Sequence, residues 1–167
     1  MTVTIRLACP DDAAAVTGVL EASYPTLMAT SYDAELLRLA TPIITRPNQK
    51  LLASGTYYVA EKGDGAIIGC GGWTPERPGT AEKQPGVGHV RHFATIPDRA
   101  GKGIGRMVYA RCETQARAAG IAVVECYASL NAERFYASLG FAAIDLVNVP
   151  LGDGIAFPSV LMRRLIS

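Results

Sequence analysis

The sequence predicts a single α/β domain in which helices cover a mixed, mostly antiparallel sheet, and three observations support this prediction. The chain has 167 residues, enough for one buried core, and its 49% apolar and 19% charged residues are typical of a globular protein. Short apolar or alternating segments, which favour strands, interchange with segments of helical periodicity. Glycine and proline mark most boundaries between them. The resulting element order, βααβββαβαββ, fits a layered α/β architecture.

Seven strands are expected, each a run of apolar or alternating residues between turn-forming residues. They lie at residues 2–8, 56–61, 66–73, 87–96, 121–127, 141–149 and 159–166. A Gly-Asp-Gly turn at residues 63–65 separates the second strand from the third, and so short a loop makes the pair an antiparallel hairpin. A similar turn at residues 152–154 separates the last two strands.

Four helices are expected, and local signals set their ends. They lie at residues 10–23, 33–40, 103–119 and 131–139. Pro10 suits the first turn of a helix, while Tyr24-Pro25 should end that helix because proline lacks a backbone donor. Asp33 is a suitable N-cap for the second helix. Gly120 stands where a left-handed C-cap would end the third.

The composition excludes several classes of partner. Sixteen basic and 15 acidic residues give a net charge of +1, whereas a nucleic-acid surface usually requires a marked basic excess. No apolar run approaches the roughly 18 residues that span a bilayer, so neither a nucleic acid nor a membrane is an expected partner. The 4 cysteines are scattered without a C-x-x-C pair, which argues against a disulfide scaffold, a zinc site or a redox motif. A reducing cytoplasm and no metal are therefore expected. The expected assembly is a monomer or homodimer, with no sequence feature that chooses between them.

A glycine turn between the fourth strand and the third helix is the most informative stretch. It reads TIPDRAGKGIGR at residues 95–106, and Pro97 ends the strand. A strand, a glycine turn and a helix N-terminus together form a site that binds phosphate, because free N–H groups point outward there and the helix dipole contributes about half a positive charge. Lys102 and Arg106 add full charges.

Two nucleotide-binding motifs fail on the spacing of these glycines. A G-x-G-x-x-G motif that starts at Gly103 would need its third glycine at Val108, and one that starts at Gly101 would need it at Arg106. A P-loop requires Ser or Thr after its lysine, but Gly103 follows Lys102. An ordinary strand–helix connection without a ligand stays open as an alternative.

The turn instead resembles the acetyl-coenzyme A signature of the GNAT N-acetyltransferase superfamily, [QR]-x-x-G-x-[GA]. Gly103 and Gly105 fall on its two small-residue positions, while Ala100 stands where Gln or Arg is usual. A second stretch, NAERFYASLGF at residues 131–141, resembles the short helix of that family that carries Phe-Tyr and ends in Leu-Gly-Phe. Asn131 is 5 residues before Tyr136, closer than in many members.

The resemblance implies that residues 1–167 form one GNAT domain with the acyl-CoA N-acyltransferase fold. In that fold the central strand and the next one splay apart, and the pantetheine arm of acetyl-CoA enters the gap. The implied cosubstrate is acetyl-CoA, with no metal. The residues expected to bind it are Phe93, Ala94, Thr95, Gly101, Lys102, Gly103, Ile104, Gly105, Arg106 and Asn131.

The resemblance also implies acyl transfer to an amine, and Tyr136 is the expected proton donor to the departing thiolate. A phenol with a pKa of about 10 is neutral at pH 7 and can donate a proton. His89 falls where several members place a Glu or His base, and imidazole titrates near neutrality. A core tyrosine and a solvent-facing strand histidine are the alternatives. Oxyanion stabilisation is expected from a backbone N–H near Phe93 or Ala94.

Strand alternation makes a further prediction about the central strand. His89, Arg91 and Phe93 should share one face, with His92 and Ala94 on the other. His92 is expected to be structural.

The resemblance also implies that the acceptor pocket is formed by the long polar loop at residues 75–86 and by residues 24–32, because the corresponding regions of the family flank the thioester on the side opposite the coenzyme. Tyr24 and Tyr32 are candidate walls, and packing roles for both are the alternative. The expected function is N-acetyl transfer from acetyl-CoA to a primary amine of a small molecule, peptide or protein. A non-catalytic acyl-CoA-binding protein with the same fold is the alternative.

Overall fold

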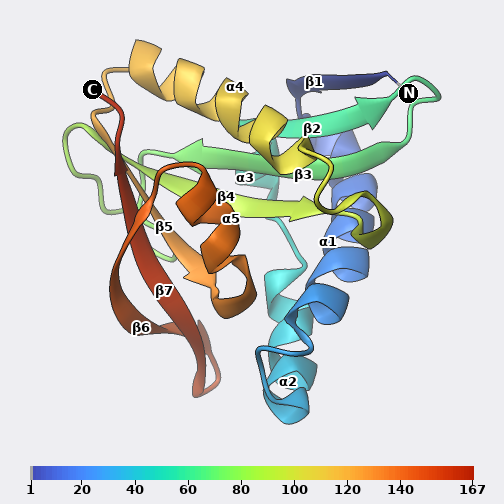
Figure 1. Cartoon of the computed structure of the whole chain (residues 1–167), viewed down its shortest axis with the longest axis vertical. Coiled ribbons are helices and arrows are strands. Elements are labelled where there is room, and N and C mark those ends of the chain that lie inside the picture. Colours follow the sequence, from blue (N-terminus) through green and yellow to red (C-terminus); the bar gives the residue numbers. More distant parts are fainter. Residues whose placement is uncertain (1) are drawn as a thin grey trace.

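The computed structural model describes residues 2–167 as a seven-stranded sheet of order β1-β2-β3-β4-β5-β7-β6 flanked by helices (Figure 1). The strands are β1 (Val3–Leu7), β2 (Tyr57–Lys62), β3 (Ile67–Thr74), β4 (Val87–Thr95), β5 (Val123–Ser129), β6 (Ala142–Gly152) and β7 (Ile155–Leu165). The helices are α1 (Ala13–Met28), α2 (Ala34–Ile44), α3 (Gln49–Leu52), α4 (Ile104–Ala118) and α5 (Glu133–Ser138). Short 3-10 turns are η1 (Pro10–Asp12), η2 (Pro97–Arg99) and η3 (Leu130–Ala132).

The predicted mixed, mostly antiparallel α/β sheet is confirmed. Every strand pair is antiparallel except β4 with β5, which is parallel. The observed helices and strands follow the predicted order with α3 added. None of the helices in residues 2–167 is long and apolar enough to cross a membrane.

The central strands β2 and β3 are mostly buried on both faces, and β2 illustrates how. Successive side chains of a strand point to opposite faces. Tyr58 and Ala60 pack in the core beneath α4 and α5, while Tyr57 and Val59 pack in a second core with α1 and α3. All four are buried. The central strands are therefore packed between helices on both faces, and this packing positions the end of β4.

α1 passes through Pro25 and ends at Met28, so the predicted end near residue 23 is wrong. An interior proline removes a backbone hydrogen bond and costs about 3 kcal/mol. Contacts around the proline offset this cost. Burying a side chain such as Met28, which is 4% exposed, contributes about 1.5 to 3 kcal/mol. In addition, the Tyr24 hydroxyl donates a hydrogen bond to the Phe93 carbonyl at 3.0 Å.

α2 and α3 differ from expectation in similar ways. The Asp33 carboxylate caps α2, as predicted, by accepting a hydrogen bond from the Glu35 N–H at 2.9 Å. The helix nevertheless continues through Pro42 to Ile44 instead of ending near residue 40. α3 was not predicted; it is a single turn that Asn48 caps.

β4 and β5 pair over only three residues, from Val87↔Val123 to His89↔Glu125. Beyond this point the two strands separate, and Figure 1 shows the β5–β7–β6 part of the sheet turning away from β1–β4. The gap that opens between them is the splay that the family resemblance implies.

A β-bulge interrupts β4 beside this gap. Arg91 pairs with Gly72 and Ala94 pairs with Cys70, so the register shifts across residues 92 and 93. His92 has a φ of 44°, in the left-handed region. The bulge reverses the alternation: Phe93 packs on the α4 side and Ala94 on the α1 side. The prediction that Phe93 shares a face with His89 and Arg91 is therefore wrong, because it assumed a regular strand.

Candidate active site

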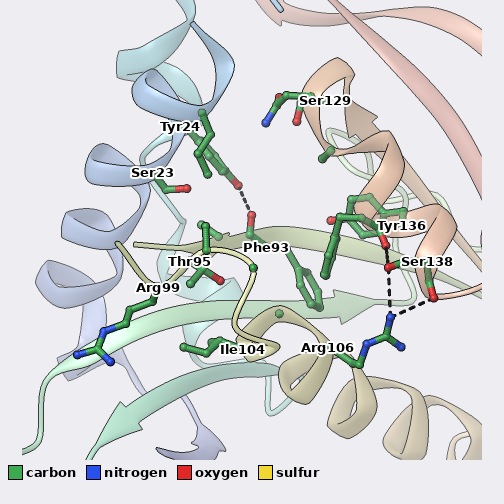
Figure 2. A pocket seen from close by; sticks show the side chains of 18 of the residues that line it. Ser23, Tyr24, Phe93, Thr95, Arg99, Ile104, Arg106, Ser129, Tyr136 and Ser138 are labelled. Atoms are coloured by element: carbon green, nitrogen blue, oxygen red, sulfur yellow. Dashed lines mark hydrogen bonds between the residues drawn. The ribbon is translucent and has the colours of Figure 1, made fainter. Parts of the chain in front are cut away.

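A cavity of about 470 Å³ opens beside the splayed end of β4. Its walls come from the C-terminal half of α1, the end of β4, the turn into α4, and the segment from residue 129 to α5 (Figure 2). The lining residues are Ser23, Tyr24, Leu27, Met28, Phe93, Ala94, Thr95, Arg99, Ala100, Gly101, Gly103, Ile104, Gly105, Arg106, Ser129, Asn131, Ala132, Phe135, Tyr136 and Ser138. No carboxylate side chain is among them. We refer to this space as the larger cavity.

The glycines of the turn have two different roles. Gly101 and Gly103 have φ angles of 75° and 84°, which only glycine adopts without strain, and a Cβ at either would meet no atom within 4 Å. Gly103 is the N-cap of α4, so the free N–H groups of the first helical turn begin there. At Gly105, by contrast, a Cβ would lie 2.8 Å from Cζ of Phe135. Glycine at this position lets the Phe135 ring pack against α4.

Of the ten residues expected to bind the cosubstrate, all except Lys102 line the larger cavity. The exposed guanidinium of Arg106 donates hydrogen bonds to the carbonyl and hydroxyl oxygens of Ser138, at 3.1 and 3.2 Å, and so joins α4 to α5. Oδ1 of Asn131 is buried and has no hydrogen-bond partner within residues 2–167. A buried oxygen without a donor is costly, so this position suits a ligand that brings an N–H group.

A second cavity of about 220 Å³, the smaller cavity, adjoins the first. Its lining residues are Tyr24, Met28, Ile44, Pro78, Val90, Arg91, His92, Phe93, Cys126, Tyr127, Ala128, Ser129, Ala132, Tyr136, Val149, Leu151, Phe157 and Ser159. Tyr24, Phe93 and Tyr136 are among the residues that line both cavities. The two spaces therefore meet at these three side chains.

The two tyrosines at this junction differ in how their hydroxyls are engaged. The Tyr24 hydroxyl donates to the Phe93 carbonyl (Figure 2). The Tyr136 hydroxyl, by contrast, donates no hydrogen bond to another group within residues 2–167. The Tyr136 ring is held by Phe93, Phe135 and Phe141, at centroid distances of 6.3, 5.0 and 5.6 Å. Burial raises the pKa of both phenols, so both are protonated at neutral pH. Tyr136 is thus a fixed phenol with a proton to donate.

Buried donors hold the carbonyl groups of the β4 bulge. The Tyr57 hydroxyl donates to the His92 carbonyl at 2.8 Å, and Sγ of Cys70 lies 3.7 Å from the same oxygen. Tyr24 holds the Phe93 carbonyl. The C=O and N–H of a planar trans peptide point in opposite directions. Fixing the His92 carbonyl toward Tyr57 therefore fixes the Phe93 N–H in the opposite direction.

The structure places the two histidines in different surroundings. His89 is 3% exposed and lines neither cavity, and its pKa is lowered mainly by burial, while the nearby Glu125 acts in the opposite direction. The position of His89 therefore does not favour its expected role as proton acceptor. His92, expected to be structural, lines the smaller cavity, and burial together with Arg91 lowers its pKa to about 4. His92 lies in the bulge itself.

The walls of the smaller cavity differ from the expected acceptor pocket. From the loop at residues 75–86 only Pro78 lines it. Tyr32 lines neither cavity: its hydroxyl donates to the Pro158 carbonyl at 2.6 Å and accepts from the Leu130 N–H at 2.8 Å. Its ring stacks on Phe157, with centroids 4.3 Å apart, so Tyr32 joins β7 to η3.

Sequence reasoning missed several walls of the smaller cavity. These are Arg91, His92, Val149, Leu151, Phe157 and Ser159. The last four come from the β6–β7 hairpin, and no local signal in the sequence indicates which sheet face a distant hairpin covers. Within residues 2–167 no group of three or more His, Cys, Asp or Glu side chains could hold a metal ion.

Comparison with known proteins bears on this arrangement. Residues 22–141 match a family model described as the acetyltransferase (GNAT) family. A GCN5-related N-acetyltransferase structure from Rhodopseudomonas palustris is similar at a TM-score of 0.80 and 23% identity, covering 99% of this chain and 96% of the other. The paiA N-acetyltransferase of Thermoplasma acidophilum, solved with coenzyme A, has a TM-score of 0.74 at 16% identity and 99% coverage of both chains.

A third similar structure is yncA from Salmonella typhimurium, solved with acetyl-CoA, at a TM-score of 0.65 and 22% identity. The alignment covers 100% of this chain and 95% of that one. Comparison with curated proteins gives no match. At these identities the solved structures establish the fold.

Proposed function

The chain belongs to the GNAT acetyltransferase family, and from that premise we propose that it transfers the acetyl group of acetyl-CoA to a primary amine of a small molecule, peptide or protein. The observation that carries this proposal is the meeting of two cavities at Tyr136 and Phe93. One cavity suits the cosubstrate and the other suits the amine. The similar structures that were solved with coenzyme A or acetyl-CoA support the choice of acyl donor.

The larger cavity fits acetyl-CoA on three counts. Its volume of about 470 Å³ falls within the range of small-molecule and cofactor sites. The left-handed glycines and the N-terminus of α4 present backbone N–H groups, with Arg99 and Arg106 nearby and no carboxylate in the lining, which suits a pyrophosphate. The unsatisfied Oδ1 of Asn131 suits an amide N–H of the pantetheine arm.

The residues at the junction supply the groups that acyl transfer requires. Acetyl-CoA, when bound, supplies a thioester that a neutral amine can attack. Tyr136 holds the proton for the departing sulfur, and the Phe93 N–H, fixed by the Tyr57 contact to the preceding carbonyl, is the proposed donor to the developing oxyanion. The mostly apolar lining of the smaller cavity favours the neutral amine over the ammonium ion. The proton of the amine leaves through the smaller cavity to water.

A thiol-release assay tests this proposal. Purified protein with acetyl-CoA is offered a panel of amines, amino acids and peptides, and free thiol is measured together with the mass of the acetylated product. Amine-dependent thiol release with a matching product is the expected result. Coenzyme A binding without acetylation of any amine in the panel would favour the alternative, a non-catalytic acyl-CoA-binding protein.

We also propose a cytoplasmic location, where acetyl-CoA and a reducing environment are available. All 4 cysteines are free, as in proteins of reducing compartments. Size-exclusion chromatography with light scattering distinguishes the two oligomeric states, monomer and homodimer, that the proposal allows.

A further inference from the structure

Arg91 is the only side chain with a full charge in the described lining of the smaller cavity. Most of the other lining residues are apolar, and neither Asp, Glu nor Lys is among them. Arg91 immediately precedes the bulge and lies two positions before Phe93, at the junction of the cavities. Arg91 and Phe93 line the same cavity, so a small acceptor held there lies between the cation and the junction.

The guanidinium of Arg91 is held by neutral groups. Its Nε donates to Oγ1 of Thr74 at 2.7 Å, and its Nη2 donates to the Glu76 carbonyl at 3.1 Å. A guanidinium has five N–H donors, so these two bonds orient it and leave donors for a ligand. The loop at residues 75–86 therefore helps to position Arg91 in the cavity wall, through the carbonyl oxygen of Glu76.

No carboxylate within residues 2–167 forms an ion pair with Arg91. Two acidic residues near it, Glu76, whose carbonyl it contacts, and Glu125, opposite His89 on β5, pair with other cations. The Glu76 carboxylate lies 3.6 Å from Nζ of Lys83, and the Glu125 carboxylate lies 2.7 Å from Nη2 of Arg163. Partial burial lowers the pKa of Arg91, and the charge of Glu76 offsets this only in part. A half-buried cation without an anionic partner is unfavourable, and a bound anion would relieve this cost.

We propose that Arg91 binds the carboxylate of the acceptor, and that the acceptor is a free amino acid with an apolar side chain. This inference rests on the proposed acetyl transfer. Guanidinium and carboxylate match in geometry and charge. The apolar walls formed by Met28, Ile44 and Leu151 suit the side chain of such an amino acid. A lysine side chain or a polyamine would instead bring a second cation toward Arg91 with no carboxylate in the lining to receive it.

The test compares three acceptors that differ only at the carboxylate: L-leucine, L-leucinamide and 3-methylbutylamine. Wild type, Arg91→Gln, Arg91→Lys and the control Arg38→Gln are assayed by thiol release, with kcat and KM expressed per neutral amine. Arg38 is an exposed arginine whose side chain lines neither cavity. Wild type and Arg38→Gln should prefer leucine. Arg91→Gln should lose about 10- to 150-fold in kcat/KM for leucine, mainly through KM, with little change for the other two acceptors. Arg91→Lys should retain part of the preference.

The outcomes separate this inference from the proposed function. If wild type acetylates amines but does not prefer leucine, or if folded Arg91→Gln keeps the preference, the inference is overturned while acetyl transfer stands. If wild type acetylates none of the three, calorimetry of leucine against the wild-type complex with coenzyme A decides: binding that Arg91→Gln abolishes supports the inference, and absence of binding overturns it. Should Arg91→Gln fail to fold by circular dichroism, the wild-type preference among the three acceptors is decisive.

Discussion

Replacing Tyr136 with phenylalanine removes one hydroxyl from the junction of the two cavities and leaves its ring contacts in place. The ring packs edge-on against Phe135 and Phe141, and phenylalanine keeps both contacts. Because no protein group accepts the hydroxyl proton within residues 2–167, no partner is left unsatisfied. The free energy of unfolding should therefore change by less than about 1 kcal/mol.

Turnover should respond very differently. Loss of a positioned general acid typically lowers the rate by about 10²- to 10⁴-fold. Because burial raises the pKa of Tyr136 well above its ordinary value, this acid stays protonated through neutral and mildly alkaline pH, and it should add no alkaline limb to the kcat profile there.

The assay measures kcat by thiol release, coenzyme A affinity by calorimetry and stability by thermal denaturation. Tyr58→Phe is the matched control, because Tyr58 is also buried in the α4-side core but lines neither cavity. The control should keep wild-type turnover. Full activity of Tyr136→Phe on a verified acceptor would refute the reasoning and assign the proton to solvent.

Three other perturbations test separate parts of the structure. Tyr57→Phe removes the hydroxyl that donates to the His92 carbonyl at 2.8 Å. It should destabilise the fold by about 1 to 3 kcal/mol and lower kcat more than it raises KM for acetyl-CoA. An unchanged kcat would show that the bulge keeps its geometry without this hydrogen bond. His89→Gln should change kcat by only a few-fold, since His89 lines neither cavity, and a fall of about 10²-fold would restore it as the base. The pKa of Asp12 is lowered chiefly by its hydrogen bonds with Arg6, so Asp12 stabilises the fold above its unfolded pKa and loses this effect as pH falls through the lower folded pKa. Asp12→Asn should lower the free energy of unfolding in urea by about 1 to 3 kcal/mol at pH 7, allowing for the partial exposure of Arg6, and by less below about pH 4. An equal loss at both pH values would contradict the ion pair.

The sequence predicted those features that depend on neighbouring residues. The turn into α4 is specified locally, by Pro97 and the glycines after it, and the structure places nearly all of the predicted cosubstrate residues around one cavity. The hairpin at residues 63–65 and the Asp33 cap are local in the same sense.

Features that depend on distant contacts could not be predicted. α1 passes through Pro25 because Met28 and Tyr24 find partners elsewhere in the fold. The β4 bulge is stabilised by Tyr57, which lies 35 residues away from His92, and no residue of β4 itself signals it. Since a bulge reverses strand alternation, this single feature displaced the predicted position of Phe93. His89 lies before the bulge, and its role depended instead on its burial by distant residues.

The acceptor pocket depends even more on contacts between residues that are distant in the sequence. Its walls combine β4, β5, α1, α2 and the β6–β7 hairpin, so it exists only once the sheet order is known. Tyr32 was a reasonable candidate as an aromatic residue in a suitable segment. It instead makes two hydrogen bonds to the backbone that hold η3 and β7 together.

The central claim, that the glycine turn binds coenzyme A, is tested most directly by titrating coenzyme A into wild type, Gly103→Asp and Gly120→Asp. Both glycines have nearly the same φ, 84° and 83°, and a Cβ at either would meet no atom within 4 Å, so the two substitutions should strain the backbone to a similar extent, about 1 to 2 kcal/mol. Only Gly103 lines the larger cavity. Gly103→Asp should weaken coenzyme A binding at least about 30-fold, corresponding to about 2 kcal/mol or more, while Gly120→Asp binds like wild type. A folded Gly103→Asp variant with unchanged affinity would contradict the claim.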